Sequence, residues 1–241
     1  MRHVNIIGLD LGQASDPSAL IFLECPIWVH ADIAAALNIR NHGHLAPSDL
    51  TPHQLSRLPH ETPPEPLPLL LRGLKRYELG TPYPAIVEDV TRLCERQPHR
   101  KQTALVIDKT GVGAPVFDLF VAAGLAPIGI TITGGDTVIA VEGGFRVPKR
   151  DLVGVVQSLL QTRRLKFAEA LPLLGVLKQE LQNFRVKIDP KTAHDSYSAW
   201  REGLHDDMVL GCALACWWAE RGIDTRTYMT TYAQPARIGR G

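Results

Sequence analysis

Short apolar runs that end at an aspartate occur at the start and in the middle of the chain. Residues 4–9 are apolar except for Asn5 and lead into Asp10, and residues 103–107 lead in the same way into Asp108. Runs of this length, rich in β-branched residues, are typical of buried strands. Further strands are predicted over 18–23 and 128–132, with another beginning within 27–29 and a hairpin over 137–147 that turns on Gly143-Gly144.

Helical periodicity appears between and after these strands. Apolar residues within 83–97 share one helical face, so Glu88 and Asp89 fall on a solvated face and Glu88 is discounted as a metal ligand. Further helices are predicted from about 114, over 149–163, over 171–184 and from 205 to about 220. The last of these is apolar nearly all round after Asp207, which predicts burial on most sides.

Proline interrupts the region from about 38 to 84. We expect an extended excursion there, with one helical turn near 69–77. His42 and His44 could hold a metal ion, but a solvated loop is the favoured interpretation. The expected organisation is one α/β domain over 1–223, which includes this excursion, and a polar tail over 224–241.

Composition narrows the class of protein only in part. The chain has 241 residues, a net charge of +1 and four scattered cysteines without a CxxC pair, which argues against a zinc ribbon. Its N-terminus does not resemble a signal peptide, and no apolar run of about twenty residues lacks charge. We therefore expect a cytoplasmic protein without a membrane partner.

The candidate chemistry depends on aspartates. Asp10 and Asp108 end strands, and Asp206 and Asp207 open the last helix. Each has a simpler explanation as a turn or helix-start residue. Acids on a helix that then becomes apolar need a partner, however, and an all-oxygen set suits two Mg²⁺ or Mn²⁺ ions.

The residues around this acidic set have more open roles. Asp207 is favoured over Asp206 as a direct ligand. His205 is a candidate for a supporting contact or for proton transfer, with a backbone-bonding histidine as the alternative. Asp16 is interpreted chiefly as a turn former before Pro17.

Six segments, taken in order, resemble the nuclease domain of phage large terminases over nearly the whole chain. They are GLDLGQASDPSAL, ALVIDKTGVGAPVFDLF, ITGGD, FRVPKRDLVGVVQSLLQTRRLKFA, LKQELQNF and GLHDDMVLGCALA. The resemblance implies an RNase H-like α/β fold with a central mixed β-sheet flanked by helices. It also implies an endonuclease that cuts concatemeric viral DNA during genome packaging in a bacterial host.

The same resemblance assigns residues and partners. Asp10, Asp108 and the pair Asp206–Asp207 correspond to the catalytic acids. A terminase ATPase motor, a small terminase and a portal are implied as partners besides double-stranded DNA. This chain contains no GxxxxGK[ST] motif, so it is expected not to translocate DNA by itself.

DNA contacts are expected to involve the phosphate backbone, with little sequence preference. The basic candidates are Lys149, Arg150, Arg163, Arg164, Lys166, Arg185 and Lys187, with Lys109 as a further phosphate contact. Three other functions remain open from the residues: a Holliday-junction resolvase, a sugar-kinase-like or actin-like ATPase, and a DNA-binding module without activity.

Overall fold

The computed structural model describes residues 2–12, 16–27, 67–96, 103–186 and 206–222. The strands are β1 (Arg2–Asp10), β2 (Ala19–Ile27), β3 (Leu69–Arg76), β4 (Thr103–Asp108), β5 (Ile128–Thr133), β6 (Ile139–Val141), β7 (Gly144–Pro148) and β8 (Leu165–Phe167). The helices are α3 (Tyr83–Glu95), α4 (Gly113–Ala122), α5 (Lys149–Gln161), α6 (Leu174–Val186) and α7 (Asp207–Trp217), followed by the π-helical turn η3 (Trp218–Gly222).

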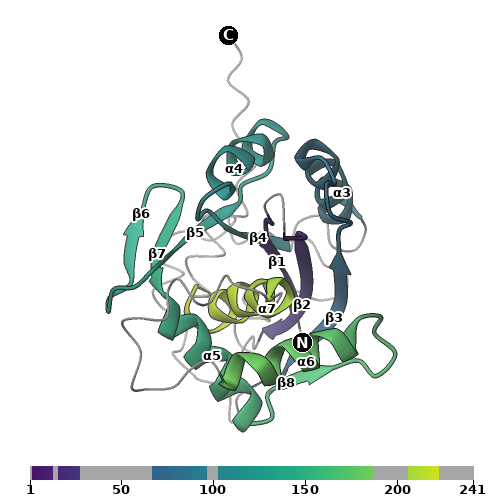
Figure 1. The fold of residues 1–241 in the computed structure, drawn as a ribbon, viewed down its shortest axis with the longest axis vertical. Helices are drawn as coiled ribbons and strands as arrows, with labels where there is room; N and C mark the ends of the chain where they lie inside the picture. Colours follow the sequence, from purple (N-terminus) through teal and green to yellow (C-terminus); the bar gives the residue numbers. More distant parts are fainter. Residues whose placement is uncertain (1, 13–15, 28–66, 97–102, 187–205, 223–241) are drawn as a thin grey trace, which may run out of the picture.

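All eight of these strands form one mixed sheet in the order β6-β7-β5-β4-β1-β2-β3-β8 (Figure 1). β1, β2 and β3 are successive antiparallel neighbours, whereas β1, β4, β5 and β7 run parallel. Helices cover both faces. The predicted fold class, an α/β fold with a central mixed sheet flanked by helices, is confirmed.

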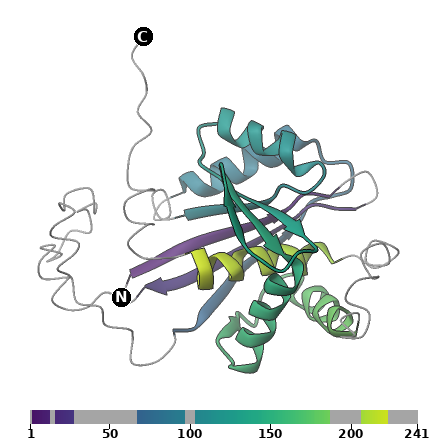
Figure 2. The same ribbon diagram turned by 90° about the vertical axis from the view of Figure 1, so that its left-hand side faces the viewer.

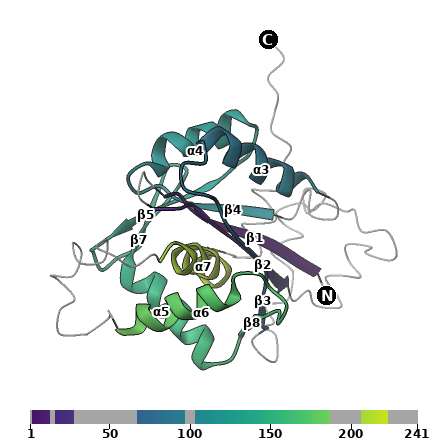
Figure 3. The ribbon, with the colours of Figure 1, turned by 45° about the vertical axis from the view of Figure 1, so that its right-hand side comes forward.

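Alternating side chains divide the core into two layers. On β1, Val4 and Ile6 pack in the cluster that includes α5, α6 and α7, whereas Ile7 and Leu9 pack in the cluster that includes α3 and α4. Figure 3 shows α3 and α4 on one face of the sheet and α5, α6 and α7 on the other. Since side chains alternate along a strand, Gly8 and Asp10 belong to the face that α7 covers.

Helix α7 lies directly on the sheet (Figure 2). Every residue from Asp207 to Trp217 is buried, as the apolar pattern predicts. Contact with β1 is made through glycine: a Cβ atom on Gly8 would lie 2.0 Å from the carbonyl oxygen of Gly211. No side chain separates helix and strand at this point, so α7 approaches the backbone of β1.

Most predicted elements are confirmed, with small shifts at their ends. The hairpin turns on Glu142 and Gly143, with Gly143 at φ 72°, while Gly144 already belongs to β7. α6 begins at Leu174 rather than at Leu171. Cys212 and Cys216 are buried core residues, as expected.

Two predictions need correction, and one strand was not predicted. The expected helical turn near 69–77 is wrong, because Leu69–Arg76 forms β3 between β2 and β8. No separate strand begins at Ile27, which is the last residue of β2. β8 was not predicted at all. A three-residue strand such as β8 is recognisable only by its pairing with β3.

Several expectations lie outside the described residues. They concern His42 and His44, most of the proline-rich excursion, the polar tail, His205 and Lys187. Within the described residues, no helix is both long and apolar enough to cross a bilayer.

Candidate active site

Asp10 and Asp108 stand next to each other at the carboxyl ends of two neighbouring parallel strands. The register pairs Leu9 of β1 with Ile107 of β4, and each aspartate is the next residue along its strand. Val106 packs in the same cluster as α7, so Asp108, two residues later, belongs to the α7 face of the sheet, as Asp10 does. The sheet therefore places two carboxylates side by side beneath one helix.

The loop after β4 holds Asp108 in place. Its Oδ1 accepts a hydrogen bond of 2.8 Å from the backbone N–H of Thr110, and the side chain is 8% exposed. A Cβ atom on Gly113 would lie 1.8 Å from the Asp108 carbonyl oxygen, so the chain doubles back tightly here. The Asp108 carboxylate is thus oriented by its own turn at the edge of the sheet.

The two aspartates of α7 occupy the start of the helix. Asp206 is the N-cap residue and Asp207 begins the helix. Asp207 is 4% exposed, whereas Asp206 is partly buried. Asp206 makes no side-chain capping bond to α7, contrary to the alternative that these acids only stabilise their own helix end.

Asp10 lies within electrostatic reach of the other acids at this edge. The pKa of Asp10 is raised well above its ordinary value, first by burial and then by four neighbouring carboxylates. In decreasing order of effect these are Asp108, Asp207, Asp206 and Asp16. Asp108, Asp207 and Asp206 therefore all lie within electrostatic reach of Asp10, and Asp16 has the smallest effect of the set.

Two charged residues that the sequence did not single out lie at this group. Glu180 of α6 accepts hydrogen bonds from the backbone N–H groups of Met208 (3.2 Å) and Val209 (3.3 Å). Its other oxygen pairs with Nη2 of Arg76, the last residue of β3. The same Nη2 atom lies 3.6 Å from Oδ2 of Asp207.

Glu180 is a buried carboxylate, 7% exposed. Burial raises its pKa, and this outweighs the opposite effect of Arg76 and of the two amides. No local pattern marks Glu180 or Arg76 as special, since each belongs to an ordinary charged position of its element. Arg76 would have been found only if β3 had been predicted as a strand next to β2.

The donor chemistry fits a hard divalent cation. Asp10, Asp108, Asp206 and Asp207 supply carboxylate oxygens, the ligands that Mg²⁺ and Mn²⁺ prefer. In the described part of the chain, no three His, Cys, Asp or Glu side chains lie close enough together to hold an ion. Like charges repel, so these carboxylates would have to turn toward a common ion as it neutralised them.

Among the basic candidates, Lys149 and Arg150 lie at the edge of the sheet where the acids gather. They begin α5 directly after Pro148, the last residue of β7. β7 is parallel to β5, and β5 is parallel to β4, so the carboxyl end of β7 points to the same edge as Asp108. Arg150 is exposed and pairs with Asp136.

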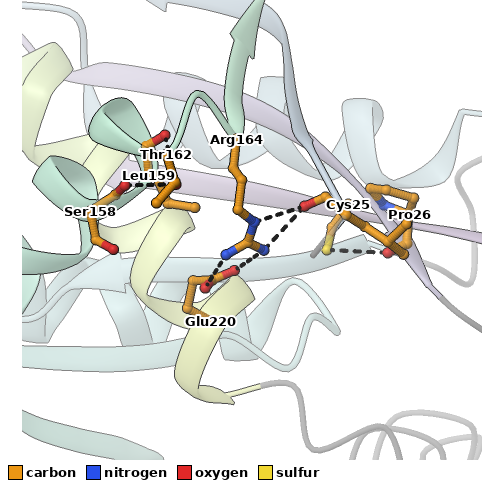
Figure 4. A network of polar contacts seen from close by, with 8 residues as sticks. Cys25, Pro26, Ser158, Leu159, Thr162, Arg164 and Glu220 are labelled. Atoms are coloured by element: carbon orange, nitrogen blue, oxygen red, sulfur yellow. Dashed lines mark hydrogen bonds and ion pairs between the residues drawn. The ribbon is translucent and has the colours of Figure 1, made fainter. Parts of the chain in front are cut away.

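Arg163 and Arg164 follow the opposite end of α5, roughly 20 Å away along the helix axis. Arg164 forms bonds of 2.7 and 2.8 Å with the two carboxylate oxygens of Glu220 in η3 (Figure 4). It also donates to the carbonyl oxygen of Leu67. Arg163 is exposed, with φ 56°. The structure therefore does not bring Arg163 and Arg164 to the acidic edge.

Lys109 points away from the acids. Its Nζ lies 4.1 Å from the centre of the Phe117 ring on α4, which packs on the opposite face of the sheet. Lys166 is exposed on β8, and the side chain of Arg185 lies outside the described residues.

No protein-family model matches this sequence. No curated protein matches it either. Two solved structures are similar to this chain. One is the large terminase nuclease from thermophilic phage G20c, with 17% identity and a TM-score of 0.48, covering 88% of this chain and 81% of that chain. The other is the Mn-soaked human cytomegalovirus terminase nuclease domain, with 9% identity and a TM-score of 0.42, covering 90% of this chain and 83% of that chain. At these values, function has to be inferred from this chain's own residues.

Proposed function

We propose that this chain is a divalent-metal-dependent endonuclease that hydrolyses phosphodiester bonds of double-stranded DNA. The observation that carries the proposal is the convergence of Asp10, Asp108 and the Asp206–Asp207 pair at one edge of the sheet. Four carboxylates around a buried position cost free energy unless a cation or a substrate interaction compensates. A site for two cations supplies that compensation.

Asp10, Asp108 and Asp207 are the residues that would hold Mg²⁺ or Mn²⁺, with Asp206 as a further ligand or as a residue that orients one. When bound, two such ions supply a nucleophile from water and stabilise the charge on the leaving oxygen. The backbone N–H of Thr110 keeps the Asp108 carboxylate oriented. Burial of Asp108 and Asp207 keeps their charges in a medium where they attract cations strongly.

Phosphate contacts are assigned to Lys149 and Arg150, because these residues lie at the same edge of the sheet as the acids. The sequence also predicts Arg163, Arg164 and Lys187 as DNA contacts. Arg163 and Arg164 follow the far end of α5, so the contacts beside the acids are assigned to Lys149 and Arg150 alone. Contacts to the backbone of DNA position the duplex and give little sequence preference. Weak sequence preference and a steep dependence on salt are therefore expected.

The six sequence segments that resemble terminase nucleases, in the same order along the chain, extend the proposal to a biological role. In that role the chain cuts concatemeric viral DNA during packaging, in the cytoplasm of a bacterial host. An ATPase motor, a small terminase and a portal would be its partners. The translocating motor would have to be supplied outside residues 1–241, since no phosphate-loop motif occurs in them.

Plasmid digestion with Mg²⁺ or Mn²⁺ tests the activity. The variants are Asp10→Asn, Asp108→Asn and Asp207→Asn, each of which keeps the size of the side chain but removes a charge. We expect each variant to lose at least about 100-fold in cutting rate, since a lost ligand removes transition-state stabilisation of about 3 kcal/mol or more. The matched control is Asp118→Asn, because Asp118 is exposed on α4.

Undiminished cutting by Asp10→Asn would contradict the assigned site. Loss of cutting in Asp118→Asn as well would mean that the assay reports on folding. A four-way DNA junction belongs in the substrate panel, because a strong preference for it over linear duplex would favour a resolvase-like activity. Tight ATP binding without any DNA cleavage would favour the ATPase alternative.

A further inference from the structure

We propose that Arg76 and Glu180 form a positioning pair that holds the first turn of α7, and with it Asp206 and Asp207, against the sheet. The expected effect of this pair on cleavage rests on the proposed function. The pair itself is inferred from the contacts among α6, β3 and α7. Neither residue is assigned here as a metal ligand. Their role is to act through the aspartates that α7 carries.

The first turn of a helix leaves N–H groups that need acceptors, and the N-cap side chain usually accepts those of the second or third helical residue. In α7 these residues are Met208 and Val209, and both N–H groups bond Oε2 of Glu180 instead. A carboxylate from another helix therefore caps α7. Glu180 thus joins α6 to the turn of α7 that bears the acids.

This arrangement changes what Asp206 can do. An aspartate that caps its own helix turns its carboxylate back toward the backbone N–H groups of the first turn. Because Glu180 occupies those groups, Asp206 does not have to perform this task, and it makes no capping bond. The carboxylate of Asp207 lies instead beside Arg76, whose Nη2 is 3.6 Å from Asp207 Oδ2.

Arg76 ties the same turn to the sheet. Asp10 pairs with Ala19, and Ala19 pairs with Arg76, so the three residues form one row across β1, β2 and β3. Ala19 is fully buried and small, which lets the arginine side chain extend over the α7 face. Its Nη2 contacts both Glu180 and Asp207.

Arg76 also supplies a positive charge beside a group of negative ones. Its side chain is 23% exposed, and its Nε atom is buried without a hydrogen-bond partner among the described residues. A partly buried guanidinium between two carboxylates resists rotation, because breaking one bond leaves a charge unpaired. The pair Arg76–Glu180 thus fixes where Asp207 stands relative to Asp10.

The first experiment compares Glu180→Ala, Glu180→Gln and the control Gln179→Ala, an exposed neighbour on α6. Three quantities are measured on the full chain: amide hydrogen exchange of Met208 and Val209, Mn²⁺ affinity, and kcat and KM for plasmid cleavage. Thermal unfolding identifies any variant that fails to fold. Glutamine keeps an acceptor oxygen, so it is the conservative variant that tests for rescue.

For Glu180→Ala we expect faster exchange of both amides and a loss of about 10–100-fold in Mn²⁺ affinity, the range typical when a residue that orients metal ligands is removed. kcat should fall with little change in KM for DNA. Glu180→Gln should restore amide protection and recover part of the Mn²⁺ affinity. Gln179→Ala should resemble the wild type in all three measurements.

Arg76→Gln, with Arg72→Gln as its control, tests the other half of the pair. Arg72 lies on the same strand but pairs with Glu24 at an exposed site, so its replacement should leave Mn²⁺ affinity unchanged. Arg76→Gln should weaken Mn²⁺ binding, and its effect should be smaller when Glu180 is already glutamine. Such non-additivity is the signature of two residues that act as a unit.

The outcomes separate this inference from the proposed function. Unchanged Mn²⁺ affinity in a folded Glu180→Ala variant overturns the positioning role, even if the wild type cuts DNA. A wild type that binds Mn²⁺ without cutting DNA overturns the proposed function. The positioning role then still stands if Glu180→Ala weakens Mn²⁺ binding and Glu180→Gln recovers it.

Discussion

Gly8 of β1 and Gly211 of α7 meet backbone to backbone, so closely that a Cβ atom on Gly8 would lie 2.0 Å from the Gly211 carbonyl oxygen. Asp10 follows Gly8 by two residues on the same face of the strand. Asp207 precedes Gly211 by about one helical turn. The contact between the two glycines therefore sets how near the start of α7 comes to the end of β1, and hence the spacing of the acids.

Gly8→Ala is expected to push α7 away from β1. The added methyl group meets backbone rather than a flexible side chain, so the protein should lose about 1–3 kcal/mol of its free energy of unfolding. Mn²⁺ affinity should fall as well, because the acids move apart. Urea unfolding and Mn²⁺ titration measure the two effects.

Gly154→Ala is the matched control for this substitution. Gly154 lies within α5, and nothing stands within 4 Å of a Cβ atom built there. Alanine at an open helix position should stabilise the protein by about 0.5–1 kcal/mol. If Gly8→Ala lowered the free energy of unfolding no more than Gly154→Ala does, the inferred close contact between α7 and β1 would be contradicted.

Asp10→Asn should stabilise the protein when EDTA removes divalent ions. Burial and repulsion from the neighbouring carboxylates both disfavour the charged form of Asp10. Asparagine has no charge, so it removes this cost. We expect a gain of about 0.5–2 kcal/mol in the free energy of unfolding, together with loss of activity. Added Mn²⁺ should raise the melting temperature of the wild type and leave that of the variant unchanged. A variant less stable than the wild type in EDTA would contradict this explanation.

Arg164→Met is expected to lower the free energy of unfolding by about 1–2 kcal/mol. Methionine keeps the apolar stem but removes the paired bonds to Glu220 (Figure 4) and both bonds to the Leu67 carbonyl. Lys166→Met, at an exposed position on β8, should change stability by less than about 0.5 kcal/mol. Weaker DNA binding by Arg164→Met at unchanged stability would show that this residue serves DNA rather than the fold.

The contacts of Asp89 make one part of the stability depend on pH. Lys75 and Tyr77 donate hydrogen bonds of 2.6 and 2.8 Å to Asp89 Oδ2. Burial alone would raise the pKa of Asp89, but these bonds outweigh it and leave the pKa below its ordinary value. A carboxyl group with a lowered pKa stabilises the fold above the pKa of the unfolded chain, about 3.9, and that contribution disappears as pH falls through the folded pKa.

Asp89→Asn should therefore be less stable than the wild type near neutral pH, and the difference should shrink as the pH is lowered below about 4. Urea unfolding of both proteins at a series of pH values measures this difference. A difference that stayed constant over the whole range would show that the Asp89 charge contributes nothing. Asp89 was expected on a solvated face, and its contacts with β3 explain why it is only partly exposed.

The strands and the helix that the sequence predicted from clear apolar runs are present in the structure. The runs that lead into Asp10 and Asp108 are strands, and the apolar segment after Asp207 is a buried helix. Hydrophobic periodicity reports on burial within one element, so it identifies such elements without knowledge of their neighbours. β3 was missed because Leu69–Arg76 shows no clear alternation and is a strand through its pairing with β2 and β8.

The sequence by itself determined which elements carry acids at their ends and which chemistry those acids suit. Only the tertiary structure decided that Asp10 and Asp108 adjoin, that Gly8 and Gly211 let α7 approach, and that Glu180 caps α7 while Arg76 bridges to Asp207. The physical reason is that strand order, helix approach and capping by a distant side chain join residues far apart in the chain. No periodicity within a single element reports such contacts.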